Sequence, residues 1–225
     1  LETSKIVLGK EHPNTLTRIQ NLAVTLREMG KLNETLSLQQ PLYETSKRVL
    51  GKEHPNTLMR IQNLAEIFRH LGRFNEALAL EQPLLETSKR VLGEEHPNTL
   101  AKIQNLAVIF WEMGRFDETL SLEQSLLQTS KRVLGEEHPS TMTTIQNLAV
   151  TLIEMSRFNE ALSLQQPLLE KSKSVLGEEH PNTLSRIQNL AELFKRMGRL
   201  NEALSLEQPL LETSRRVLGQ EHPHT

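Results

Sequence analysis

Six histidines spaced 42 residues apart are the first residues of this chain whose type suggests chemistry. Each precedes a proline in the recurring phrase Leu-Gly-x-Glu-His-Pro-x-Thr: His12, His54, His96, His138, His180 and His222. Imidazole is a common metal ligand and a general acid or base. Metal ligands must converge within about 2 Å of one ion, whereas stacked helices one repeat apart are separated by roughly 10 Å. The spacing therefore predicts junction residues that pack or cap helix starts, with no metal site.

The remaining composition favours no catalytic or cofactor site. Serine and threonine are frequent, but none lies in a nucleophile elbow, and each glycine reads as a helix stop rather than as part of a phosphate loop. The net charge is −2 with acids and bases interspersed, which argues against binding to nucleic acid or to an anionic membrane. No apolar run approaches the roughly 20 residues of a membrane span. The chain has no cysteine, which fits a cytoplasmic protein. We expect no enzymatic activity and no cofactor.

The elements that position these residues are visible in the repeat from His54 to Glu95. Apolar residues at three- and four-residue spacing predict one amphipathic helix over about 55–71 and a second over about 76–92. Gly72 ends the first helix, Asn75 is expected to be the N-cap of the second, and Gly93 is expected to be left-handed after its end. Each repeat is therefore an antiparallel helix pair, which buries its apolar stripes only by stacking on its neighbours.

The period predicts one all-α solenoid of stacked antiparallel helix pairs over residues 1–225. Its five full repeats span about 12–53, 54–95, 96–137, 138–179 and 180–221, with partial repeats at both ends. The sequence opens inside a period and without methionine, so we interpret it as a fragment of a longer protein.

These repeats resemble a known family. Asn63-Leu64-Ala65, Gly72 and the Asn-Glu-Ala-Leu that begins at Asn75 are similar to the tetratricopeptide repeat pattern. The period of 42 with its Leu-Gly-x-Glu-His-Pro junction resembles the repeats of kinesin light chains, and also those attached to nucleotide-binding oligomerisation proteins. The resemblance implies a right-handed superhelix whose concave groove is lined by the first helix of each repeat and binds peptides.

Differences between the repeats concentrate at four positions of the first helix. They are Thr17, Met59, Ala101, Thr143 and Ser185; Val24, Glu66, Val108, Val150 and Glu192; Arg27, Arg69, Trp111, Ile153 and Lys195; and Glu28, His70, Glu112, Glu154 and Arg196. At about 100° per residue, the first, second and fourth positions lie opposite the apolar stripe. A constant scaffold with a varied face predicts a recognition surface. Neutral drift on a solvated face is the alternative.

A repeated asparagine is the main candidate for backbone recognition: Asn21, Asn63, Asn105, Asn147 and Asn189. A side-chain amide donates and accepts, as a peptide backbone requires, and some tetratricopeptide arrays are similar in using such an asparagine ladder. Structural bridging between adjacent helices explains the same residues equally well. Kinesin light chains bind short acidic peptides with an aromatic anchor. That resemblance implies that Arg27, Arg60, Arg69 and Lys102 meet acidic side chains and that Trp111 contacts the anchor, with Glu66, Glu192 and Lys195 on the same surface.

The function predicted from the sequence is a protein-interaction scaffold that binds an extended peptide or partner segment in the groove of the first helices. One alternative is a structural array that associates head to tail through exposed terminal repeats. Another is a regulatory repeat segment of a larger nucleotide-binding switch protein.

Overall fold

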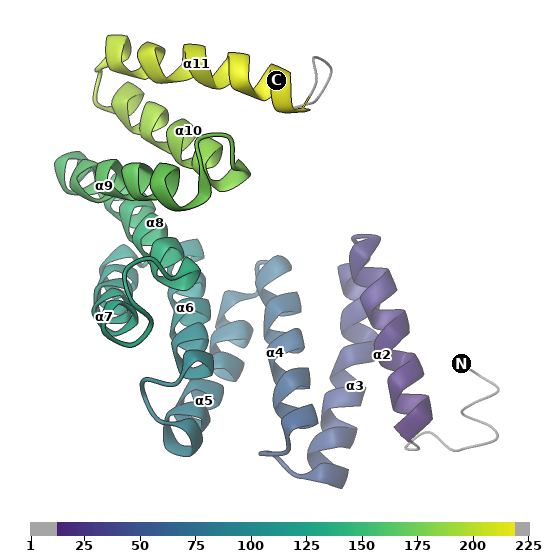
Figure 1. Ribbon diagram of the computed structural model, residues 1–225. Coiled ribbons are helices and arrows are strands. Elements are labelled where there is room, and N and C mark those ends of the chain that lie inside the picture. The colour runs from purple at the N-terminus through teal and green to yellow at the C-terminus, as the bar shows by residue number, and fades with distance from the viewer. Residues whose placement is uncertain (1–12, 219–225) are drawn as a thin grey trace. The chain divides into compact units, whose positions relative to one another are not determined.

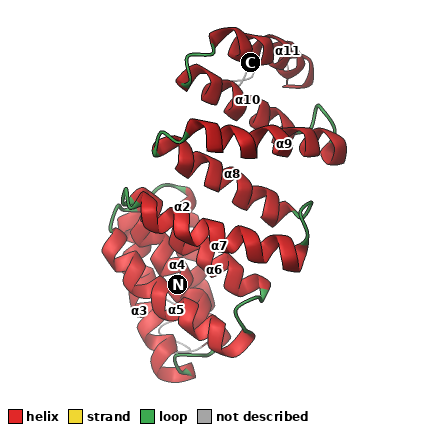
Figure 2. Cartoon of the chain, turned by 90° about the vertical axis from the view of Figure 1, so that its left-hand side faces the viewer, coloured by secondary structure: helices red, strands yellow, loops and turns green. Residues whose placement is uncertain are grey.

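The computed structural model describes residues 13–218, and the regular structure in that range is entirely α-helical (Figures 1 and 2). Its helices are α2 (Pro13–Glu28), α3 (Leu32–Leu50), α4 (Pro55–His70), α5 (Phe74–Leu92), α6 (Pro97–Glu112), α7 (Phe116–Leu134), α8 (Pro139–Glu154), α9 (Phe158–Leu176), α10 (Pro181–Arg196) and α11 (Leu200–Leu218). The predicted alternation of a first and a second helix in each repeat is confirmed. His12 and His222 lie outside the described residues.

The junction histidines cap the first helices, as predicted. His54 has extended backbone, and its Nδ1 accepts a hydrogen bond from the N–H of Asn56 at 3.2 Å. His96, His138 and His180 accept the equivalent bond at 3.1 Å. Because proline follows each histidine, the first helical residue has no N–H to satisfy. Sequence and cap together fix where the first helix begins.

The turn between the two helices of a repeat is shorter than the sequence suggests. Gly72, with φ +71°, donates to the Arg69 carbonyl at 2.9 Å, and Arg73 donates to the Phe68 carbonyl at 2.8 Å. This bonding pattern closes the first helix tightly. The second helix therefore begins at Phe74 with Arg73 in the cap position, and the prediction that Asn75 is the N-cap is wrong. Arg73 instead donates to Glu76 across the first turn, with Nε and Oε1 2.9 Å apart.

The second helix ends at a glycine of a different conformation from the one predicted. Gly93 has φ +95° and ψ 160°, so its φ is positive but its ψ is extended rather than left-handed helical. Side chains rarely occupy this region. Gly51, Gly135 and Gly177 have nearly the same angles, which gives each described junction the same geometry.

The helices form two compact units, α2–α6 and α7–α11. Within each unit, every helix packs against the next one along the chain. The core of the first unit includes Leu64, Ile67 and Phe68 of α4 together with Ala77 of α5 and Ile109 of α6.

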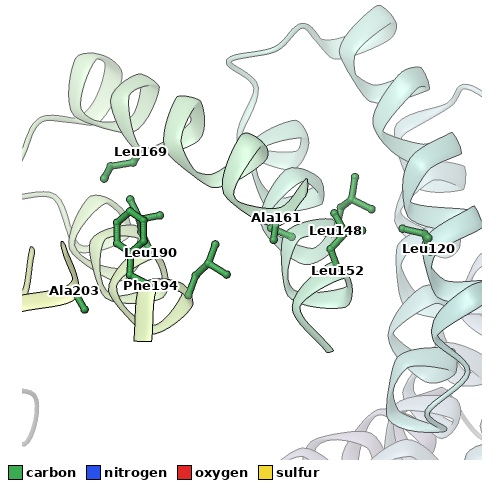
Figure 3. Close-up of a cluster of buried hydrophobic side chains, with 10 residues drawn as sticks. Leu120, Leu148, Leu152, Ala161, Leu169, Leu190, Phe194 and Ala203 are labelled. Atoms are coloured by element: carbon green, nitrogen blue, oxygen red, sulfur yellow. The ribbon is translucent and has the colours of Figure 1, made fainter. Parts of the chain in front are cut away.

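Figure 3 shows the corresponding core of the second unit, with Leu148 and Leu152 of α8 near Ala161 of α9, and Leu190 and Phe194 together on α10. Ala161 is fully buried. A small residue at this point lets neighbouring helices approach closely, and α9 packs against both α8 and α10.

Candidate functional site

The residues predicted to bind a partner gather along seams between repeats. A seam is defined here as the strip where the two helices of one repeat meet the first helix of the next. The first seam lies among α2, α3 and α4, the second among α4, α5 and α6, and the C-terminal seam among α8, α9 and α10. Side chains bridge the first helices across each seam. The cavities described below lie in two of these seams.

Ion pairs across the seams use the residues that vary between repeats. Arg27 Nη1 lies 2.9 Å from Glu66 Oε2 across the first seam. Arg69 Nη1 lies 2.5 Å from Glu112 Oε1 across the second seam, and both of these side chains are only about a quarter exposed. Across the C-terminal seam, Arg196 Nη1 lies 3.1 Å from Glu154 Oε1.

These pairs show that much of the variation is matched between neighbours. Charge complementarity accounts for six of the varied residues without any ligand. Four of the five residues at the second varied position also depart from the expected open face. Val24, Glu66, Val108 and Val150 are half-buried, and the first three line cavities in the seams, whereas Glu192 is exposed. They face the neighbouring repeat because adjacent first helices flank the seam on both sides.

A cavity recurs in the first two seams with the period of the sequence. In the second seam it has a volume of about 230 Å³ and is lined by Gln62, Ala65, Glu66, Arg69, Glu81, Asn105, Val108 and Ile109. In the first seam it has a volume of about 60 Å³ and is lined by Gln20, Ala23, Val24, Arg27, Thr35, Gln39, Asn63 and Ile67. Most of these residues lie 42 positions before their counterparts, so the two cavities are copies of one site with different side chains.

A wider hollow of about 580 Å³ lies nearer the start of α4 and α6. Leu58, Met59 and Leu84 give it an apolar lining, and Ala101 and Lys102 of α6 face them. Met59, which is 48% exposed, and Ala101 occupy the first varied position. The small side chain of Ala101 leaves room that a larger residue would occupy, so variation here changes the shape of the surface.

Two of the repeated asparagines line cavities in the seams. Asn63 and Asn105 line the two cavities, Asn147 and Asn189 are half-buried, and Asn21 is exposed. The amide of Asn105 interacts with the Glu81 carboxylate and lowers its pKa in part. In this copy the asparagine therefore bridges adjacent repeats while it borders the cavity.

Most of the charged residues predicted to contact a partner form ion pairs or hydrogen bonds with other residues of the chain. Lys102 donates to Gln62 Oε1 across the second seam. Lys195 Nζ lies 2.5 Å from Glu207 Oε1 and 3.7 Å from Glu192 Oε2.

Two further candidates, Arg60 and Trp111, differ from each other in exposure. Arg60 is 7% exposed, its Nε and Nη1 have no hydrogen-bond partner, and burial lowers its pKa. Trp111 is 36% exposed.

A recurring buried polar position in the second helices was missed by the sequence reasoning. It is occupied by Gln39, Glu81, Glu123 and Gln165, which are each 3–5% exposed, and by the half-buried Glu207. Burial raises the pKa of Glu123 to about 7, and interaction with the Thr151 hydroxyl opposes this rise. Burial also raises the pKa of Glu81, against the lowering by Lys102 and Asn105. The signal was present in the sequence, because a polar residue interrupts the apolar stripe of the second helix in every repeat, as Glu81 does between Leu78 and Leu84.

Within residues 13–218, no group of side chains is arranged to hold a metal ion. No helix in the same range is long and apolar enough to cross a membrane. The chemistry that the seams offer is hydrogen bonding and ion pairing from side chains on fixed helices.

Comparison with known proteins decides the family. The model of the tetratricopeptide repeat matches residues 15–82, 58–118, 99–166 and 142–216, which together span nearly all of the described helices. The chain belongs to the tetratricopeptide repeat family. A comparison with the curated proteins found none that matches this chain.

Solved structures of other tetratricopeptide proteins share the fold. The nearly identical TPR-like repeats of a candidate kinesin light chain from Podosopora anserina are 25% identical, with a TM-score of 0.79 over 94% of this chain and 99% of that one. A point variant of the same protein gives a TM-score of 0.80. BtubC from P. vanneervenii is 20% identical, with a TM-score of 0.74 over 93% of this chain and 83% of its own. The predicted likeness to kinesin light chain repeats is confirmed.

Proposed function

We propose that this chain is a protein-interaction scaffold that binds an extended segment of a partner protein along the first helices of its repeats. The observation that carries this proposal is the seam cavity that recurs with the 42-residue period and is bordered by Asn63 in one copy and Asn105 in the next. A ligand that lies across several first helices would meet one such amide per repeat. Tetratricopeptide arrays generally serve as interaction scaffolds, which supports the same function. We propose the cytoplasm as its location, because a chain without cysteine fits a reducing compartment.

The proposed division of roles follows from the contacts. The asparagine amides would hold the backbone of the partner, because an amide matches both the N–H and the C=O of a peptide. The varied residues would supply selectivity in two ways: Met59, Ala101 and Trp111 by shape, and the paired arginines and glutamates by setting the separation of the first helices. Hot spots at protein interfaces commonly centre on a few such side chains.

The test is a pull-down from a peptide library with the full chain and with Asn63→Ala and Asn105→Ala variants. We expect both substitutions to reduce peptide capture, because each removes one amide from the line of contacts. Asn75→Ala is the matched control, since Asn75 is an exposed asparagine at the start of α5 and lines none of the described cavities. Equal capture by all four proteins, with unchanged helix content, would show that the asparagines do not bind the partner.

Head-to-tail association is the second candidate, and one observation favours it. Helix α11 exposes Leu200, Leu204 and Leu211 at 64%, 51% and 40%. Leu36 and Leu120, at the position equivalent to Leu204, are only 8–9% exposed in their own repeats. Light scattering across a range of concentrations measures association directly. A monomer at every concentration, unaffected by Leu204→Lys, would reject it.

A further inference from the structure

The second-seam cavity contains a carboxylate that its neighbours do not neutralise. Glu81 is 3% exposed, lines the cavity, and has no hydrogen-bond partner for its Oε2. Two bases lie near it, but Arg69 of the cavity wall contacts Glu112 and Lys102 donates to Gln62. A buried carboxylate without a counter-ion is costly, so a group that supplies positive charge and a donor would be favoured there.

The bases around Glu81 are held by other acceptors. Arg69 lies against Glu112 at 2.5 Å, and Glu66, the other acid of the cavity wall, is already paired with Arg27 at 2.9 Å. Lys102 is near enough to lower the pKa of Glu81, but its Nζ donates to the neutral Gln62. The pKa of Glu81 is still raised overall, so Lys102 and Asn105 do not offset the loss of hydration of this carboxylate.

The cavity is large enough to admit the end of a side chain. Its volume of about 230 Å³ greatly exceeds the roughly 10–15 Å³ that a single water needs on a comparable measure. The first-seam copy has a volume of about 60 Å³ and holds Gln39, the neutral isostere of glutamate, at the position of Glu81. The size and the charge of the site therefore change together between the two repeats.

We propose that the second-seam cavity receives a lysine or arginine side chain of the bound partner, with Glu81 as its counter-ion. This inference rests on the proposed scaffold function and specifies the chemistry of one ligand position. Lysine and arginine carry only donors at their charged ends, and hydrogen bonds between ionised groups are stronger than neutral ones. An inserted cation would lower the pKa of Glu81, so binding would strengthen as the pH rises.

The direct test uses side-chain analogues, so it does not depend on knowing the partner. The full chain is titrated with n-butylguanidinium and n-butylammonium, and with n-butanol as the neutral control. NMR follows the side-chain amide of Asn105 and the carboxyl carbon of Glu81, which Glu81→Gln assigns. We expect saturable shifts with both cations, a lowered Glu81 pKa, and no such response to butanol. Absent shifts, or equal shifts with butanol, would overturn the proposal.

The protein supplies its own matched variants. Glu81→Gln places at this position the residue that Gln39 and Gln165 already provide in other repeats, so the fold tolerates it. We expect cation affinity to fall about tenfold or more, the loss expected when a charged hydrogen bond is removed. Gln39→Glu places the acid in the first seam and is expected to create a weaker second site in its smaller cavity. Equal affinity of the wild-type and Glu81→Gln proteins would reject the assignment.

The peptide-library pull-down separates this inference from the scaffold function. If wild type captures peptides and Glu81→Gln loses only the enrichment for lysine and arginine, both proposals hold. If capture persists with the same composition, the basic-residue site is wrong and the scaffold function stands. If wild type captures nothing, the scaffold function fails, while the titration with the analogues still decides whether the cavity binds cations.

Discussion

Replacing Glu123 by glutamine tests the recurring buried polar position through the pH dependence of stability. Glu123 is 5% exposed, its Oε2 has no hydrogen-bond partner, and burial raises its pKa from 4.5 to about 7. Below pH 4.5 the carboxyl is protonated in both the folded and the unfolded chain, so burial carries no ionisation penalty. Between pH 4.5 and 7 the unfolded chain ionises first, and the folded state loses stability as the pH rises.

The magnitude follows from the two pKa values. One pKa unit corresponds to about 1.4 kcal/mol, so linkage gives a penalty of about 1 kcal/mol at pH 5 and about 3 kcal/mol at pH 8. Glutamine has nearly the same shape and does not ionise. We therefore expect Glu123→Gln to gain about 2 kcal/mol relative to wild type between pH 5 and pH 8.

Urea denaturation followed by circular dichroism at both pH values measures this gain. The difference between the two proteins is the informative quantity, because every other titrating group cancels. Gln165→Glu, at the equivalent position of the next repeat, is the matched control and should show the opposite sign. If wild type and Glu123→Gln differ by the same amount at pH 5 and pH 8, the reasoning that burial raises this pKa is refuted.

Three further substitutions test the fold. Arg69→Glu should destabilise the chain by about 1 kcal/mol, and the double exchange with Glu112→Arg should restore most of the loss in a double-mutant cycle of thermal unfolding; additive losses would mean that the pair contributes nothing. Ser156→Gly should raise stability by about 1 kcal/mol, because Ser156 has φ +59° where four other repeats have glycine. His96→Ala should cost about 1 kcal/mol in urea denaturation by removing the cap of α6, whereas a chelator should leave the melting temperature unchanged.

The fold was largely predictable because its determinants are local and repeated. Proline after histidine marks each first helix, and the apolar spacing marks both helices. The boundary at Asn75 was not predictable in the same way. Asparagine is a strong cap on average, but here the Gly72 turn fixes Arg73 and leaves only a short connection before Phe74. The local backbone hydrogen bonds of the Gly72 turn overrode the capping preference of asparagine.

The candidate site was only partly predictable, for a different reason. The sequence indicated Asn105 and Arg69 as groove residues, but the partner of Arg69 lies 43 positions away on another first helix. No local pattern specifies which of several acids a long side chain will reach. Glu81 was overlooked because an amphipathic pattern tolerates one polar residue, and only the packing of α5 shows that this residue is enclosed.

The uniform junction has a consequence for how such an array changes in evolution. Each described junction has a histidine cap followed by proline at the start of one helix and a glycine of the same conformation at the end of the previous one. An in-frame duplication or deletion of one period would therefore join ends that already fit. The new neighbours would differ in the charges and in the side-chain sizes that meet across a seam. Chain length is thus free to change by recombination, and later point substitutions at a few first-helix positions are enough to rematch the new contacts.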